Sequence, residues 1–299
     1  MQRGLGDTIE AIAEATGVAA AVEAVVGECG GCQQRRDWLN RVFPYHVCGD
    51  AHDVIPFTGP VVRNLMMHIY PVRAHQFWRW NVDQVRSRMH LFNGHRAIAV
   101  VTDETTDSLN DVQRSFGDDR IDTWIVDENR SDLRETHTWH RLISACHSCD
   151  PNTITFTCHA KGVRGGRSYD DPGVDRRNPT SLWAACMYET CLDGHRMAEQ
   201  LLERNVFAGS LKVRGAFGGG SWHYAGTFYW FRNAKLFAMP NWHEIENVWY
   251  GTETYPGTKV GWGQAGCIFG ERVGSMYEES EWERLLPQWM EWRKTHLSG

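Results

Sequence analysis

Apolar runs and amphipathic stretches alternate along most of the chain. The apolar runs are short and continuous, as in strands buried on both faces of a parallel sheet, and lie at 65–72, 96–102, 122–127 and 153–158. Stretches with apolar residues at helical spacing lie at 76–92, 109–116, 133–146, 182–205 and 279–294. Strand–helix alternation at this spacing predicts βαβ units, and therefore an α/β fold with a Rossmann-type parallel sheet and flanking helices.

The stretch Ser221–Asn233 has seven aromatic residues among its thirteen, counting His223. Aromatic and β-branched residues favour a strand. Flat rings with a polar tip also stack on the apolar faces of sugars and bases. The candidate residues for an acceptor or sugar site are therefore Trp222, Tyr224 and, further along, Trp249. The alternative is a core strand that follows a glycine turn.

The first 60 residues have a pattern of their own. Narrow apolar stripes at helical spacing on either side of Gly17 predict a small helical module. A CxxC follows, and its cysteines with later histidine and cysteine residues are candidate zinc ligands: Cys29, Cys32, His46 and Cys48, with His52 as a further option. This is half of a zinc motif, so the alternative is a loop with free thiols. Pro56 and Gly59 indicate a linker, which predicts a module at 1–60 and a domain at 61–299.

Composition narrows the classes of protein. The 299 residues are 42% hydrophobic and 23% charged, which is typical of a globular protein. The net charge of −6 argues against broad electrostatic binding of nucleic acid. No apolar run reaches the roughly 20 residues of a membrane helix, and the start lacks a signal-peptide pattern. Nine cysteines, several of them within expected elements, predict reduced thiols and a cytoplasmic protein.

Polar and basic residues gather where the expected parallel strands end. In open parallel sheets, ligands bind beyond the carboxyl ends of the strands. The candidate donor-binding residues at these ends are Tyr70, Val72, Arg73, Asp103, Asn129, His159 and Lys161. An aspartate in such a place also serves as a turn or helix cap. The chain has neither GxGxxG nor GxxxxGK[ST] at a strand–helix turn, which excludes a dinucleotide dehydrogenase and a P-loop protein.

Several segments resemble a group of bacterial and viral glycosyltransferases. They are His-Ala-Lys-Gly-Val at 159–163, the helix with Trp183 and Met187-Tyr188, Trp-His-Tyr-Ala-Gly-Thr-Phe-Tyr-Trp at 222–230, and Trp249 with Glu253. The resemblance covers roughly residues 63–270. It implies a GT-A-like fold with a mixed sheet, in which one half binds a nucleotide-sugar and the other an acceptor. It also implies that Asp103 and Asn129 lie on the donor side.

The chain departs from that group at one position. No clear Asp-x-Asp metal motif is present, and His159 and Lys161 stand where it is expected. Because the departing diphosphate needs a metal or fixed cations, Lys161, Arg164 and His159 are candidate cations, and the use of a divalent metal stays open. Glu253 and His223 are the candidate bases for the acceptor hydroxyl. Inversion and retention are both open.

The opening Gly-Leu-Gly-Asp-Thr at 4–8, with the CxxC and the basic segment Arg35–Arg41, resembles bacteriophage-encoded proteins over roughly 45 residues. This raises a narrower hypothesis, a glycosyltransferase that modifies a hydroxymethylated pyrimidine of phage DNA. The net charge opposes it and the basic segment favours it. A hypothesis of another class is a non-catalytic module that binds a sugar, a nucleotide or zinc. The sugar, the acceptor and the oligomeric state are left open.

Overall fold

The computed structural model describes residues 55–74, 76–162, 179–217 and 220–297, all within one compact unit, Asp50–Gly299. The expected helical module lies outside these residues. So do the candidate zinc ligands Cys29, Cys32, His46 and Cys48, and the candidate cation Arg164.

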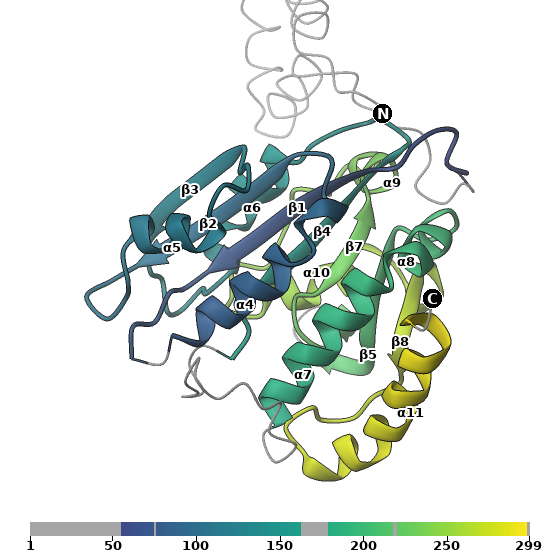
Figure 1. The fold of residues 1–299 in the computed structure, drawn as a ribbon. Helices are drawn as coiled ribbons and strands as arrows, with labels where there is room; N and C mark the ends of the chain where they lie inside the picture. The colour runs from purple at the N-terminus through teal and green to yellow at the C-terminus, as the bar shows by residue number, and fades with distance from the viewer. Residues whose placement is uncertain (1–54, 75, 163–178, 218–219, 298–299) are drawn as a thin grey trace, which may run out of the picture. The chain divides into compact units, whose positions relative to one another are not determined.

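The centre of the described unit is an eight-stranded mixed sheet (Figure 1). Its strands are β1 (Val62–Ile69), β2 (Arg96–Thr102), β3 (Thr123–Glu128), β4 (Thr153–His159), β5 (Phe207–Phe217), β6 (Gly220–Tyr224), β7 (Tyr229–Arg232) and β8 (Ala265–Glu271). The order is β3-β2-β1-β4-β7-β5-β6, with β8 paired to β5. The first four strands are parallel, whereas β7 is antiparallel to β4. The expected α/β class and the four parallel strands are confirmed.

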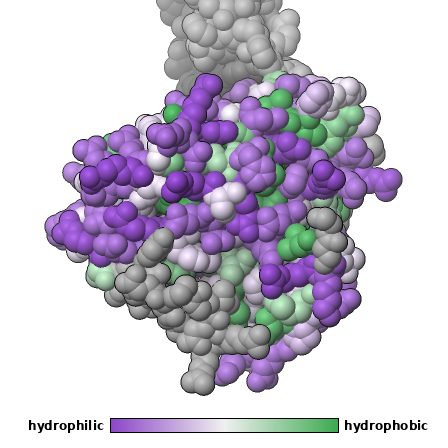
Figure 2. All heavy atoms as spheres, in the orientation of Figure 1, coloured by the Kyte–Doolittle hydropathy of each residue, from purple (hydrophilic) through white to green (hydrophobic). Residues whose placement is uncertain are grey.

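Helices cover both faces of the sheet. They are α4 (Phe77–Arg86), α5 (Leu109–Phe116), α6 (Thr136–Ala145), α7 (Pro179–Tyr188), α8 (His195–Leu202), α9 (Asn233–Phe237), α10 (Gly251–Lys259) and α11 (Glu279–Leu297). In Figure 1, α4, α7, α8 and α11 lie in front of the sheet and α6 lies behind it. Hydrophilic residues dominate the face seen in Figure 2, because these amphipathic helices pack their apolar sides inward. No described helix is long and apolar enough to span a bilayer.

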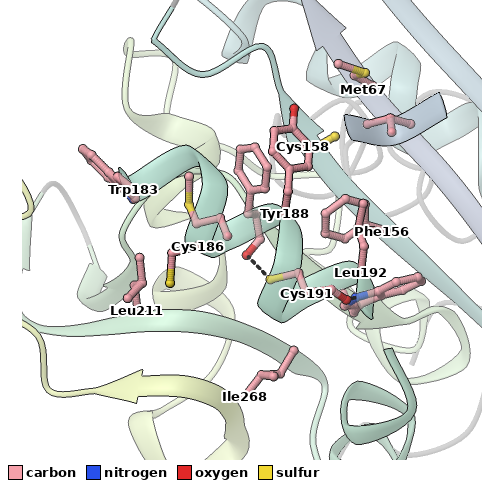
Figure 3. Packing of buried hydrophobic residues seen from close by; sticks show 14 of the residues in the cluster. Met67, Phe156, Cys158, Trp183, Cys186, Tyr188, Cys191, Leu192, Leu211 and Ile268 are labelled. Carbon is pink, nitrogen blue, oxygen red and sulfur yellow. Dashed lines mark hydrogen bonds between the residues drawn. The ribbon is translucent and has the colours of Figure 1, made fainter. Parts of the chain in front are cut away.

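Alternation along β1 divides the interior into two layers. Leu65, Met67 and Ile69 join a large apolar cluster with α4, α5, α7, α8 and α11. Figure 3 shows part of this cluster, where Cys158 of β4 lies near Tyr188 of α7. The alternate residues of β1 include the buried polar side chains of Asn64 and His68, which face the other side of the sheet. One face of the sheet is therefore apolar, while the other carries polar side chains beneath α6.

Two expected elements differ from the structure. The aromatic stretch forms β6 and β7 instead of one strand, because Gly226 reverses the chain with a φ of 89°, a value that favours glycine. The expected helix 182–205 is two helices joined by a π-helical turn, Glu189–Asp193. The expectation that the thiols are reduced holds at the described residues Cys146, Cys158, Cys186, Cys191 and Cys267. It is wrong at Cys149, which is disulfide-bonded.

Helix α10 lies unusually close to β6. A Cβ added to Gly257 of α10 would lie 1.9 Å from the carbonyl oxygen of Trp222, which is backbone and cannot rotate away. The glycine therefore sets the distance between helix and strand. Because α10 also carries Glu253, this packing sets the depth of that carboxylate.

We expect Gly257→Ala to lower the free energy of unfolding by about 1–3 kcal/mol or more, because the added methyl group forces α10 away from β6. Urea denaturation measures the effect. Gly263→Ala is the matched control, since nothing lies within 4 Å of its added Cβ. Equal stability of the two variants would contradict the close approach.

Candidate functional site

A cavity of about 340 Å³ lies at the carboxyl ends of β1, β3 and β4. Its volume is in the range of small-molecule sites. The strand ends contribute His68, Tyr70, Asn129, His159 and Lys161. The start of α6 contributes Arg134 and Glu135, while Glu253 of α10, Trp249 and Tyr277 complete the wall. The lining combines basic, acidic and aromatic groups.

Asp103, which follows β2, anchors one end of the cavity without lining it. Its carboxylate accepts hydrogen bonds from the Tyr70 hydroxyl at 2.8 Å, from Asn129 Nδ2 at 2.8 Å and from the hydroxyl and backbone N–H of Thr105 at 2.6 and 2.9 Å. Burial works to raise its pKa, but these hydrogen bonds outweigh burial and lower the pKa to about 2. Asp103 is thus a fixed anion that orients Tyr70 and Asn129 toward the cavity.

His159 and Glu135 meet on the polar face of the sheet. His159 Nδ1 lies 3.0 Å from Glu135 Oε1. Burial works to raise the pKa of Glu135, but the neighbouring His159 and His68 and a hydrogen bond bring it below its ordinary value, so this group is a carboxylate at neutral pH. Burial lowers the pKa of His68 to about 4, against the charge of Glu135. His68 is therefore neutral at pH 7, and its Nδ1 lies 2.8 Å from Thr138 Oγ1.

Lys161 is the cation deepest in the candidate site. Its Nζ lies 3.4 Å from the centroid of the Trp183 ring, a cation–π contact. Burial lowers the pKa of Lys161, while the charges of Glu253 and Glu135 oppose that change. The ammonium is thus attracted by two carboxylates and packed on an aromatic face.

The turn between β6 and β7 holds both carboxylates. The backbone N–H of Gly226 donates to Glu253 Oε1 at 2.5 Å. The neighbouring Thr227 hydroxyl donates to Glu135 Oε1 at 3.2 Å. Glu135 and Glu253 therefore lie on the two sides of one turn, although they come from different helices.

Aromatic rings stand at the rim. Trp249 and Tyr277 are 39% and 71% exposed, unusually high for such large side chains. The Arg134 guanidinium lies 4.3 Å from the Trp249 ring centroid, and the Arg134 backbone has a φ of 51°, which is strained for a residue other than glycine. Tyr277 meets Trp183 edge to face at 5.3 Å. The rim therefore presents aromatic rings next to a cation.

Six of the predicted residues line the cavity: Tyr70, Asn129, His159, Lys161, Trp249 and Glu253. Val72, Arg73 and His223 are not part of the lining formed by the described residues. Val72 bridges to Thr106 and Arg73 is exposed beside Asp107, with its Nε 3.6 Å from Asp107 Oδ1.

Trp222 and Tyr224 belong to the core, so their expected place in a sugar site does not fit the structure. They are 1% and 0% exposed. Trp222 Nε1 donates to the carbonyl of Val260 at 2.8 Å, and the Tyr224 hydroxyl donates to that of Gly266 at 2.6 Å. Their polar groups therefore bind buried backbone carbonyls. This agrees with the alternative prediction, in which the aromatic stretch is a core strand.

The lining residues that were not predicted include four with an ionisable side chain: His68, Arg134, Glu135 and Tyr277. His68 had a signal, a polar residue inside an apolar strand two positions before Tyr70. Arg134 and Glu135 lie just before α6, close to the predicted Asn129. Tyr277 precedes the terminal helix in sequence, far from every expected strand end, and had no such signal.

The described part of the chain shows no group of three or more His, Cys, Asp or Glu side chains that is placed to hold a metal ion. Glu135 and Glu253 are each engaged with the turn between β6 and β7.

Known proteins show little similarity to this chain. No protein-family model matches the chain, and no curated protein matches it in sequence. Among solved structures it is similar to a "putative nucleotide-diphospho-sugar transferase" from Desulfovibrio desulfuricans G20, with 11% identity and a TM-score of 0.35. The match covers 76% of this chain and 97% of that chain. A similarity this low does not show a function for this chain.

We expect Asp103→Asn to lower the melting temperature at pH 7. The folded pKa of Asp103, about 2, is below its ordinary 3.8, so its contribution to stability is full above about pH 4 and is lost as pH falls toward 2. Melting curves between pH 2 and 7 test this, with Glu104→Gln, an exposed neighbour, as the control. A difference between wild type and Asp103→Asn that stays constant down to pH 2 would contradict the assignment.

Proposed function

We propose that the chain is a glycosyltransferase of GT-A-like fold that moves a sugar from a nucleotide-sugar to an acceptor hydroxyl. The observation that carries this proposal is the pairing of Lys161 and Glu253 in one cavity at the carboxyl edge of a parallel sheet. Transfer of a glycosyl group with inversion requires both: a cation for the departing phosphate and a base for the attacking hydroxyl. The motifs at 159–163 and 222–230, on which the sequence resemblance depends, supply or hold these two groups.

The donor side is formed by the strand ends. Tyr70 and Asn129, oriented by Asp103, offer a ring and an amide to the nucleoside. Lys161 lies further along the same edge, with Arg134 at the rim, and both provide positive charge for the diphosphate. In this arrangement Asp103 acts on the donor through its neighbours.

The acceptor side is formed by Glu253, with Trp249 and Tyr277 at the rim. The acceptor oxygen attacks the anomeric carbon, and the bond from that carbon to the phosphate oxygen breaks. Glu253 accepts the hydroxyl proton, while Lys161 stabilises the charge that develops on the phosphate. Exposed rings suit stacking against an acceptor sugar or base. His223, which is mostly buried on β6, remains the alternative base.

Two classes of acceptor are proposed, a glycan and the hydroxymethylated pyrimidine of phage DNA, and turnover assays with each would distinguish them. A cytoplasmic location, a phage origin and a zinc site at Cys29, Cys32, His46 and Cys48 remain proposals from the sequence. Zinc analysis of chelator-free protein tests the last, and less than ~0.2 zinc per chain would contradict it.

A thermal-shift screen of UDP-, GDP-, CDP- and TDP-sugars tests the donor site directly. A donor present at 100 times its Kd adds ~2.7 kcal/mol of stability. Binding without turnover on any acceptor favours the non-catalytic module instead. If none of these donors shifts the melting temperature, the glycosyltransferase proposal loses its basis.

We expect Lys161→Ala to reduce turnover by on the order of 10²-fold or more, the scale of losing one preorganised charge. Steady-state kinetics with the donor found in the screen measure the effect. Lys294→Ala, which removes an exposed lysine of α11, is the matched control. Wild-type activity that EDTA abolishes and Mn²⁺ restores, with Lys161→Ala unaffected, would assign the cationic role to a metal.

We expect Glu253→Gln to reduce turnover by about 10²–10⁴-fold while leaving donor affinity nearly unchanged, because the amide still accepts a hydrogen bond from Gly226 but cannot take a proton. Glu279→Gln, at an exposed position in α11, is the control. Normal turnover in Glu253→Gln together with its loss in Glu135→Gln would move the base to Glu135.

A further inference from the structure

The buried side chain of Asn81 in α4 binds the backbone of Lys161, eighty positions away. Lys161 N–H donates to Asn81 Oδ1 at 3.0 Å, and Asn81 Nδ2 donates to the Lys161 carbonyl at 3.1 Å. The same amide accepts from the Tyr188 hydroxyl at 3.0 Å and donates to the carbonyl of Phe77 at 3.0 Å. Asn81 is 0% exposed, so these four hydrogen bonds account for its buried polar atoms.

The position of Lys161 in the chain explains why such an anchor is useful. The last pairing of this segment with β1 is the hydrogen bond from Ala160 N–H to the His68 carbonyl at 2.9 Å. At Gly162 the backbone turns with a φ of 85°. Lys161 thus lies between the end of a strand and a turn. A side-chain amide offers a donor and an acceptor side by side and can pair with both edges of one residue, as a neighbouring strand would.

We propose that Asn81 is a positioning residue that holds Lys161 where its ammonium meets the donor diphosphate. The inference rests on the proposed function, since it takes Lys161 as the group that binds phosphate. Helix α4 fixes the backbone of Lys161, and the Trp183 ring of α7 fixes its ammonium. The Tyr188 hydroxyl also donates to Asn81, but it makes no bond to the Lys161 backbone. A lysine held at both ends loses little conformational entropy on binding an anion.

Two measurements test this in the full-length protein. The chain has five lysines, so ¹³Cε-lysine labelling gives five ε-methylene cross-peaks, and Lys161→Arg identifies one of them. In the wild type, the protons of this peak lie upfield because the ammonium sits over the Trp183 ring. The second measurement is the Kd of the donor found by thermal shift.

In Asn81→Ala we expect the Lys161 peak to lose its upfield shift and the donor Kd to rise by on the order of tenfold or more. Asn81→Asp keeps the acceptor but loses both donated hydrogen bonds and adds a buried carboxylate near Lys161, so we expect it to change both readouts as well. Tyr188→Phe is the matched control, because it removes one partner of Asn81 but neither bond to Lys161. It leaves both readouts near the wild-type values.

A lower melting temperature in Asn81→Ala and Asn81→Asp, with the Lys161 peak and the donor Kd unchanged, would show that Asn81 only stabilises the fold. The peak separates this failure from failure of the proposed function. If the wild type binds no nucleotide-sugar, the glycosyltransferase proposal fails. The Lys161 peak alone then decides whether Asn81 fixes the lysine.

Discussion

The parallel pairing of β1 with β4 is the constraint on which the cavity depends. Its register places His68 opposite His159, so the two imidazoles lie on the same face of the sheet at its carboxyl edge. A slip of one residue would turn one of them into the apolar layer. Glu135, at the start of α6, then meets His159 on this face. The charged part of the site is therefore a direct result of strand register.

Opposite charges coexist in the cavity because each has its own support. Glu135 and Glu253 take hydrogen bonds from Thr227 and Gly226, while Lys161 packs on an aromatic ring. Burying a charge is costly unless polar groups or an opposite charge compensate. Here fixed dipoles and a π face supply much of that compensation, which leaves the cation able to respond to an incoming anion.

The α/β class and its four parallel strands could be predicted from the sequence, because short continuous apolar runs are typical of strands buried on both faces. The candidate residues at the strand ends Tyr70, Asn129, His159 and Lys161 were found for the same reason: parallel topology brings strand ends together. The prediction that Trp222 and Tyr224 line a sugar site was wrong, because aromatic content does not reveal which rings face the core.

The residues that were missed depend on tertiary packing. Glu135 reaches the site through the placement of α6 on the sheet, and Tyr277 through a loop near the end of the chain. No sequence pattern predicts the hydrogen bonds of Asn81 either, since an asparagine in a helix ordinarily faces solvent. Local patterns predict elements, whereas such contacts appear only when distant segments have docked.

The cavity lining runs from His68 to Tyr277, which covers nearly the whole described chain. Contacts of such high sequence separation form late and only when the intervening segments are in place. A fragment that ends before α10 would lack Glu253, and one that begins after β1 would lack His68. The site is thus a property of the completed tertiary structure, so ligand affinity would serve as a sensitive measure of the correctly folded fraction in any preparation of this protein.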